Sequence, residues 1–230
     1  MRPLVLGVDG CRSGWVGVVA GEPPVVVHAD ATIEGLVAHV VTRYGRPAVV
    51  AIDIPIGLPD HGRRAADTLA VADLGRRRSS LFLTPIRAAL HADDLATANV
   101  ISRERTGTGV SAQAFALRKK VLEVDRWVRA APTRVVEVHP ELSFATMAGW
   151  PPEFGKRTPD GRADRLARLR AAGLDVAHLL AARPRGVAAD DLLDAAAAAW
   201  SAARVADGTA ECRPDPPECF SDGWPAAIWT

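Results

Sequence analysis

Three short valine-rich segments begin the chain, and only tight turns separate them. They cover residues 3–9 (PLVLGVD), 14–20 (GWVGVVA) and 24–29 (PVVVHA). Valine favours extended backbone, and short Gly-containing turns join strands that lie antiparallel to each other. The sequence therefore predicts a three-strand antiparallel meander at the start of the fold.

A helix and two further strands are predicted after the meander. After Thr32, apolar residues from Ile33 to Val41 recur at helical spacing, which predicts a helix. Residues 48–54 (AVVAIDI) are apolar apart from Asp53, which is typical of a strand buried on both faces. A right-handed crossover through the helix places this strand beside the first one and parallel to it. Residues 134–139 (RVVEVH) form the next predicted strand, which Pro140 ends.

These segments, followed by an alanine-rich helix from residue 189 to about residue 205, have the element order of a ribonuclease-H-like α/β fold. We predict a five-stranded mixed sheet in the order 3-2-1-4-5 with helices on both faces. A length of 230 residues suits one domain, residues 1–230. It carries a mostly helical insertion over about residues 60–130 and a Pro-rich tail, residues 208–230, expected to cap the surface.

The composition excludes several classes of protein. With 48% hydrophobic and 24% charged residues, a packed core is expected and disorder is not. The sequence contains no run near the roughly 20 apolar residues of a membrane span and begins directly with a strand, so we expect a cytoplasmic protein with no membrane partner. Three cysteines without a CxxC spacing indicate neither a disulfide framework nor a zinc site. The oligomeric state is not indicated.

Asp9 and Asp53 each end a predicted strand. Because the chain leaves the first strand in both directions, the carboxyl ends of these two strands form a topological switch point, where ligands bind. Two aspartates there are costly to desolvate and repel each other, and a bound Mg²⁺ or Mn²⁺ offsets both effects. A turn at Asp9-Gly10 and a strand-end cap at Asp53 are the structural alternatives for each residue alone.

Further carboxylates follow in the chain. Glu137 alternates with valines in the strand predicted beside the fourth one, and His139 and Glu141 come directly after it. Asp191 and Asp194 are three positions apart, so they share a face near the start of the alanine-rich helix, where capping is an alternative for Asp191. We predict that the metal ligands and catalytic residues are Asp9, Asp53, Glu137, Asp191 and Asp194. A structural hydrogen bond is the simpler role for His139.

Basic residues flank these carboxylates. Arg12 and Ser13 follow the Asp9 turn, where a substrate phosphate would lie. Lys156, Arg157 and Arg162, in or next to the segment of Gly and Pro from residue 149 to 161, are predicted to fold over the site as a basic flap that binds substrate. Ordinary solvated charges are the alternative for these residues, and also for the run Arg118-Lys119-Lys120.

Several strings resemble the domain of unknown function 429 family, whose members are predicted ribonuclease-H-like nucleases. The likeness runs from Val8 to about Trp200. More distantly, Asp9 and the pair Asp191 and Asp194 resemble acidic residues of Holliday-junction resolvases, which carry glutamate on the fourth strand where this chain has Asp53. The strings that carry the likeness are VDGCRSGWVGV, AIDIPIGLP, LGRRRSSLF, EVHPELSF, GKRTPDGR and DDLLDAAAAAW.

The resemblance implies a nuclease, that is, a phosphodiester hydrolase that depends on Mg²⁺ or Mn²⁺. One ion would generate the attacking hydroxide and a second would stabilise the leaving oxygen. A nucleic acid or a nucleotide is then the expected partner. The alternatives are a non-enzymatic nucleotide- or nucleic-acid-binding module and a small-molecule phosphotransferase. The phosphotransferase is less favoured because a single copy of the fold lacks a second phosphate loop.

Overall fold

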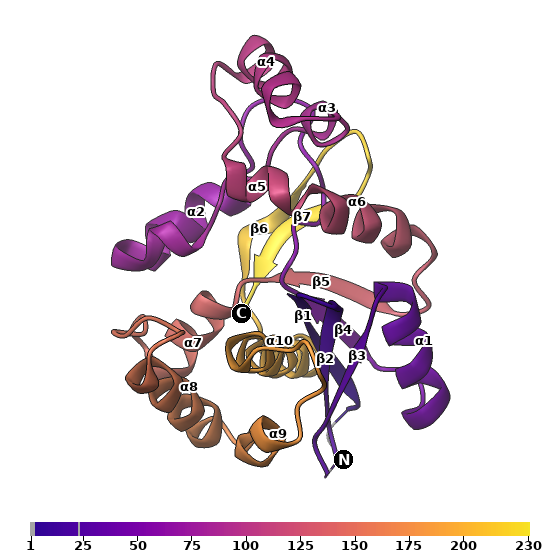
Figure 1. The fold of residues 1–230 in the computed structure, drawn as a ribbon, viewed down its shortest axis with the longest axis vertical. Helices are drawn as coiled ribbons and strands as arrows, with labels where there is room; N and C mark the ends of the chain where they lie inside the picture. The colour runs from indigo at the N-terminus through magenta and orange to yellow at the C-terminus, as the bar shows by residue number, and fades with distance from the viewer. Residues whose placement is uncertain (1–2, 23) are drawn as a thin grey trace.

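One mixed sheet runs through the molecule (Figure 1). The computed structural model describes residues 3–22 and 24–230, and within them seven strands have the order β3-β2-β1-β4-β5-β7-β6. The predicted order of the first five strands is confirmed, with β1, β2 and β3 antiparallel and β1, β4 and β5 parallel. The strands are β1 (Val5–Cys11), β2 (Gly14–Ala20), β3 (Val26–Asp30), β4 (Val49–Ile52), β5 (Arg134–Val138), β6 (Cys212–Cys219) and β7 (Pro225–Trp229).

The sheet is larger than the sequence predicts, because the C-terminal tail joins it. Strand β7 pairs parallel with β5, where Glu137 and Val138 face Ile228 and Trp229, and β6 pairs antiparallel with β7. The prediction of five strands and of a tail that only caps the surface is therefore wrong. Proline has no N–H and argues against an interior strand, and in β6 (CRPDPPEC) it is tolerated because β6 lies at the edge of the sheet.

Helices cover both faces of the sheet, as predicted. One face packs against α7 (Pro140–Ala148), α8 (Pro159–Ala171) and α10 (Ala189–Asp207), and the other packs against α1 (Ile33–Tyr44) and α6 (Arg118–Trp127). The remaining helices are α2 (Ala65–Leu74), α3 (Arg87–Leu90), α4 (Leu95–Thr106), α5 (Ala112–Ala116), α9 (Ala177–Ala181) and the 3₁₀ helices η1 (Gly75–Ser80) and η2 (Val128–Ala130). Among the described residues, no helix combines the length and apolar character needed to cross a membrane.

Helix α10 lies unusually close to the sheet. Residues 195–199, all alanine, are fully buried against β1, β2 and β4. A methyl group added at Gly7 of β1 would lie 1.9 Å from the backbone nitrogen of Ala199, so the helix backbone occupies the space of a side chain. Small residues on both elements thus set the distance between them. This packing also fixes where the first turns of α10 lie relative to the carboxyl ends of the strands.

We expect Gly7→Ala to lower the free energy of unfolding by about 3 kcal/mol, because the added methyl group overlaps helix backbone that cannot move without unpacking the core. Urea denaturation measures the change. Gly155→Ala is the matched control, since its added carbon meets nothing nearer than a Thr158 methyl at 3.8 Å. Equal stability of Gly7→Ala and wild type would show that the spacing of α10 and β1 is not limiting.

Candidate functional site

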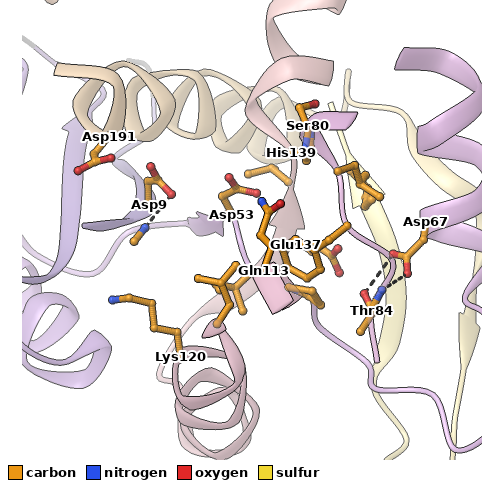
Figure 2. A pocket seen from close by; sticks show the side chains of 18 of the residues that line it. Asp9, Asp53, Asp67, Ser80, Thr84, Gln113, Lys120, Glu137, His139 and Asp191 are labelled. Atoms are coloured by element: carbon orange, nitrogen blue, oxygen red, sulfur yellow. Dashed lines mark hydrogen bonds between the residues drawn. The ribbon is translucent and has the colours of Figure 1, made fainter. Parts of the chain in front are cut away.

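A cavity of about 300 Å³ lies at the carboxyl ends of β1, β4 and β5 (Figure 2). Pockets of roughly 300–1,000 Å³ are typical of small-molecule sites, so this one is at the small end. Its wall combines residues from the strands, from α10, from the insertion between β4 and β5 and from the loop that precedes α8. Figure 2 shows Asp191 on α10 and Asp9 and Asp53 beneath that helix, with Gln113 and Lys120 across the cavity from them.

Strand alternation directs Asp9 and Asp53 to the same side. Val5 of β1 and Val49 of β4 belong to the core on the α10 face of the sheet. The next residue along each strand belongs to the core on the α1 face, so successive side chains alternate between the two faces. Asp9 is four positions after Val5, and Asp53 is four positions after Val49, so both point to the α10 face. The backbone N–H of Asp53 donates to the carbonyl of Val8 at 3.0 Å, which keeps the two chain segments adjacent.

Burial and mutual repulsion raise the pKa of three carboxyl groups. Burial raises the pKa of Asp53 to about 8, and repulsion by Asp194 is the next contribution. Burial also raises the pKa of Asp9 well above its usual range, with repulsion by Asp53 and Asp194 adding to the effect. The pKa of Asp194 rises to about 6, because its burial outweighs attraction by Lys156. Asp9, Asp53 and Asp194 therefore form one electrostatically coupled cluster, called here the acidic cluster.

Lys156 reaches into the acidic cluster from the loop before α8. Its Nζ lies 2.5 Å from Oδ2 of Asp194, whose side chain is buried, and Lys156 itself lines the cavity. Burial lowers the pKa of Lys156, but the attraction of Asp194 outweighs it, so the pKa is raised overall and the ammonium group stays charged. Lys156 thus supplies the positive charge that partly balances the cluster.

Asp191 lines the cavity and also caps its helix. Its Oδ2 accepts a hydrogen bond from the backbone N–H of Ala188 at 3.1 Å, which is the capping role that the sequence left open. Its charge contributes to the raised pKa of Asp9, as expected of a neighbour. Asp191 is therefore at the border of the acidic cluster.

Glu137 has a different partner from the one the sequence predicts. It is paired in register with Ile52, which lies in the core under α1, so Glu137 points to the sheet face opposite that of Asp53. Each of its oxygens accepts a hydrogen bond from the Arg64 guanidinium at 2.7 Å, and Oε2 also accepts from the N–H of Ile56 at 2.7 Å. Arg64 is 1% exposed and also pairs with Asp67. Although Glu137 lines the cavity, its oxygens are already satisfied by this buried network.

Glu141 and His139 are each only partly satisfied by local structure. Oε1 of Glu141 pairs with Arg165 of α8, and both side chains are buried, but Oε2 of Glu141 has no hydrogen-bond partner among the described residues. Burial lowers the pKa of His139 to about 4, so its imidazole is neutral at physiological pH. Its Nδ1 has no hydrogen-bond partner among the described residues, and the side chain lines the cavity.

The predicted phosphate-binding residues are less close to the cavity than Lys156. Arg12 and Ser13 are exposed in the turn between β1 and β2. Arg157 is 86% exposed with its Nε 3.3 Å from Oδ2 of Asp190, and Arg162 is exposed on α8. In the described chain, none of these four residues lines the cavity. Their contact with substrate stays a prediction.

The insertion supplies cavity residues that the sequence did not single out. Gln113 of α5, Leu117 between α5 and α6, and Lys120 of α6 line the cavity opposite α10. Lys120 donates to the carbonyl of Gly14, lies 4.2 Å from the ring centroid of Trp15, and has a pKa lowered by burial. The run Arg118-Lys119-Lys120 was the available signal, but a basic run on a helix is more often solvated surface.

The donor set suits a hard divalent cation, because every candidate ligand is a carboxylate oxygen. Oδ1 of Asp194 is buried with no hydrogen-bond partner in the described structure, and an unsatisfied buried acceptor is costly unless another group binds it. The residues therefore fit a cation. Among the described residues, however, no group of three or more His, Cys, Asp or Glu side chains is arranged to hold a metal ion. Metal binding stays a prediction.

The fold and the site define the class: a mixed α/β protein with a carboxylate-lined cavity at the carboxyl edge of its parallel strands. The chain belongs to the family described as protein of unknown function (DUF429), whose profile matches residues 7–219, and the resemblance noted in the sequence is confirmed. No curated protein matches the sequence significantly. Among solved structures, the chain is similar to Thermus thermophilus RuvC, with 16% identity and a TM-score of 0.37 over 90% of this chain and 97% of that one. A likeness at this level adds nothing to what the chain's own topology establishes.

Asp53→Asn should stabilise the metal-free protein near pH 8, by roughly 1–3 kcal/mol. A carboxyl group whose pKa is raised on folding, to about 8 here, binds its proton more tightly in the folded state. The free energy of unfolding therefore falls as the pH rises from the pKa of the unfolded state to the pKa of the folded state. Asparagine does not ionise, so the variant avoids this loss of stability. Urea denaturation in EDTA between about pH 5 and pH 8.5 should give a flatter profile for the variant. A wild-type profile without a decline would contradict the raised pKa.

Arg64→Met should have the opposite effect and lower the free energy of unfolding by about 3 kcal/mol, because Glu137 and Asp67 then lie buried with no cation between them. The same urea titrations measure it. The triple change Arg64→Met, Asp67→Asn and Glu137→Gln should recover part of the loss, since no member of this charge network then remains ionised. Equal stability of Arg64→Met and wild type would show that this network does not stabilise the fold.

Proposed function

We propose that this protein is a nuclease-type phosphodiester hydrolase that uses Mg²⁺ or Mn²⁺ held by Asp9, Asp53 and Asp194, with Asp191 beside them. The observation that carries the proposal is the acidic cluster itself, in which β1, β4 and α10 group three carboxyl groups with raised pKa values; Asp9 and Asp53 line the cavity, and Asp194 is buried behind its lining. Grouping like charges costs stability, and such an arrangement is a mark of a functional site. Glu137 is left out of the ligand set because Arg64 and Ile56 satisfy its oxygens.

The protein's own groups have separate tasks in this scheme. A bound divalent ion supplies a water of lowered pKa and stabilises charge on the phosphate oxygens. Asp9 and Asp53 hold their positions because paired strands fix their backbones, and Asp194 offers its unpartnered Oδ1 while Oδ2 binds Lys156. Lys156 and Lys120, which line the cavity from two sides, provide cationic partners for a substrate phosphate.

A nucleotide-binding module without turnover is the second candidate. The cavity of about 300 Å³ favours it, because that volume suits a ligand no larger than a nucleotide. In this case the acidic cluster would bind the nucleotide through a metal ion and no bond would break. Metal binding and turnover must therefore be measured separately.

Metal binding should be detectable by isothermal titration calorimetry with Mn²⁺ or Mg²⁺. We expect Asp53→Asn and Asp194→Asn each to weaken it at least about tenfold, because each removes a ligand charge. Glu211→Gln is the matched control, since that side chain is 72% exposed and lies outside the cavity lining. Equal heats for wild type and Asp53→Asn would refute the metal site.

Turnover should require Mg²⁺ or Mn²⁺ and should be lost in Asp53→Asn while the fold is kept. The assay compares wild type and variant, purified identically, on DNA, RNA, nucleotides and a small activated phosphodiester. Calcium should bind but support little turnover, because its larger and looser coordination shell does not hold the reacting groups in line. A contaminating nuclease would act equally in both preparations. Metal binding without turnover on any substrate would leave the binding module as the function.

A further inference from the structure

Two large aromatic side chains are exposed on one loop beside the cavity. Trp150 is 64% exposed and Phe154 is 44% exposed, both in residues 149–158 between α7 and α8. In the part of the chain that the structure describes, the other aromatic residue of comparable exposure is Tyr44 on α1. Leaving large rings in water forgoes the stabilisation that their burial gives, and two exposed rings on one loop are a candidate binding surface.

The loop backbone is fixed although its rings are exposed. Arg168 of α8 donates to the carbonyl of Trp150 at 2.7 Å, and Arg165 of α8 donates to the carbonyl of Phe154 at 3.2 Å. Arg77 of η1 donates to the carbonyl of Pro152 at 2.8 Å. Both α8 arginines are buried, so the loop is held from the protein side. The loop backbone therefore needs little ordering when a ligand binds to its rings.

The same loop is joined to the acidic cluster. Lys156, two positions after Phe154, makes the ion pair with Asp194 and lines the cavity. Ser80, at the end of η1, also lines the cavity, and η1 contacts the loop through Arg77. The loop that carries the rings thus also contributes to the cavity wall.

Exposed arginines lie on the loop and on the two elements next to it. Arg157 is 86% exposed on the loop, and Arg78 of η1 and Arg162 of α8 are exposed on the two elements that border it. Residues 149–158 contain one acidic residue, Glu153, and two basic residues, Lys156 and Arg157. Exposed guanidinium groups pair with phosphates, whereas aromatic faces stack on bases.

We propose that residues 149–158 are a platform for single-stranded nucleic acid, on which Trp150 and Phe154 stack unpaired bases and Arg157 contacts the phosphate backbone. The proposal rests on the proposed function and names its substrate class. Bases in a duplex stack on each other and offer no free face to a side chain, and a duplex binder needs a long basic surface that a net charge of +1 does not indicate. The small cavity at the end of the platform also suits one unpaired nucleotide.

Binding is tested without turnover, using wild-type protein in EDTA and fluorescein-labelled DNA of about 10 nucleotides, single-stranded or paired with its complement. Anisotropy should show the single strand binding at least about tenfold more tightly than the duplex. Trp150→Ala and Phe154→Ala should each weaken single-strand binding about tenfold, with unchanged thermal unfolding. Tyr44→Ala, which removes an exposed ring on α1, is the matched control and should bind like wild type. Duplex bound as tightly as single strand, or Trp150→Ala bound like wild type, would overturn the platform.

Hydrolysis of a small activated phosphodiester separates this proposal from the one it rests on. Both loop variants should retain the metal-dependent rate on that substrate, because it has no base to stack, while losing rate on single-stranded DNA. Metal-dependent hydrolysis of the small diester without preference for single strands would reject the platform and leave the hydrolase. Single-strand binding without hydrolysis of any substrate would keep the platform and reject the hydrolase.

Discussion

The close packing of α10 on the sheet is the constraint on which the site depends. Gly7 and the buried alanines at residues 195–199 let helix backbone and strand backbone approach to a distance that larger side chains would forbid. Because α10 is rigid, its first turns are then fixed over the carboxyl ends of β1 and β4. Asp194 is consequently buried near Asp9 and Asp53, and the charge repulsion among them follows from this packing.

Two sets of buried carboxylates in this protein have different partners. Glu137 and Asp67 share the buried Arg64 guanidinium and accept hydrogen bonds from the backbone N–H groups of Ile56 and Thr84, so both side chains find partners within the protein even though burial raises the pKa of Glu137. Among the described residues, the acidic cluster makes one ion pair, between Asp194 and Lys156 of the loop before α8, and one oxygen of Asp194 has no hydrogen-bond partner. A site that must bind a cation or a phosphate reversibly needs this incomplete balance, because a fully paired network offers nothing to a ligand.

The cavity is assembled from segments that lie far apart in the chain. The strands and α10 supply the carboxylates, α5 and α6 supply the opposite wall, and the loop before α8 supplies Lys156 (Figures 1 and 2). This division places acid on the strands and α10 and basic or aromatic side chains on the insertion and the loop. Under the proposed function, the metal ligands and the groups that contact substrate would therefore belong to different parts of the fold.

The sequence by itself determined the order of the first five strands, the helices on both faces and the location of Asp9 and Asp53, because these follow from local periodicity and from the handedness of the crossover. It did not determine the pairing of Glu137, because a strand's face depends on its register with its neighbour, and a shift of one residue reverses every side chain. The membership of β6 in the sheet was hidden by its prolines, which only an edge position tolerates. The cavity wall from Gln113 and Lys120 was also decided by tertiary structure, because the local signal of a basic helix is the same whether it faces solvent or a site.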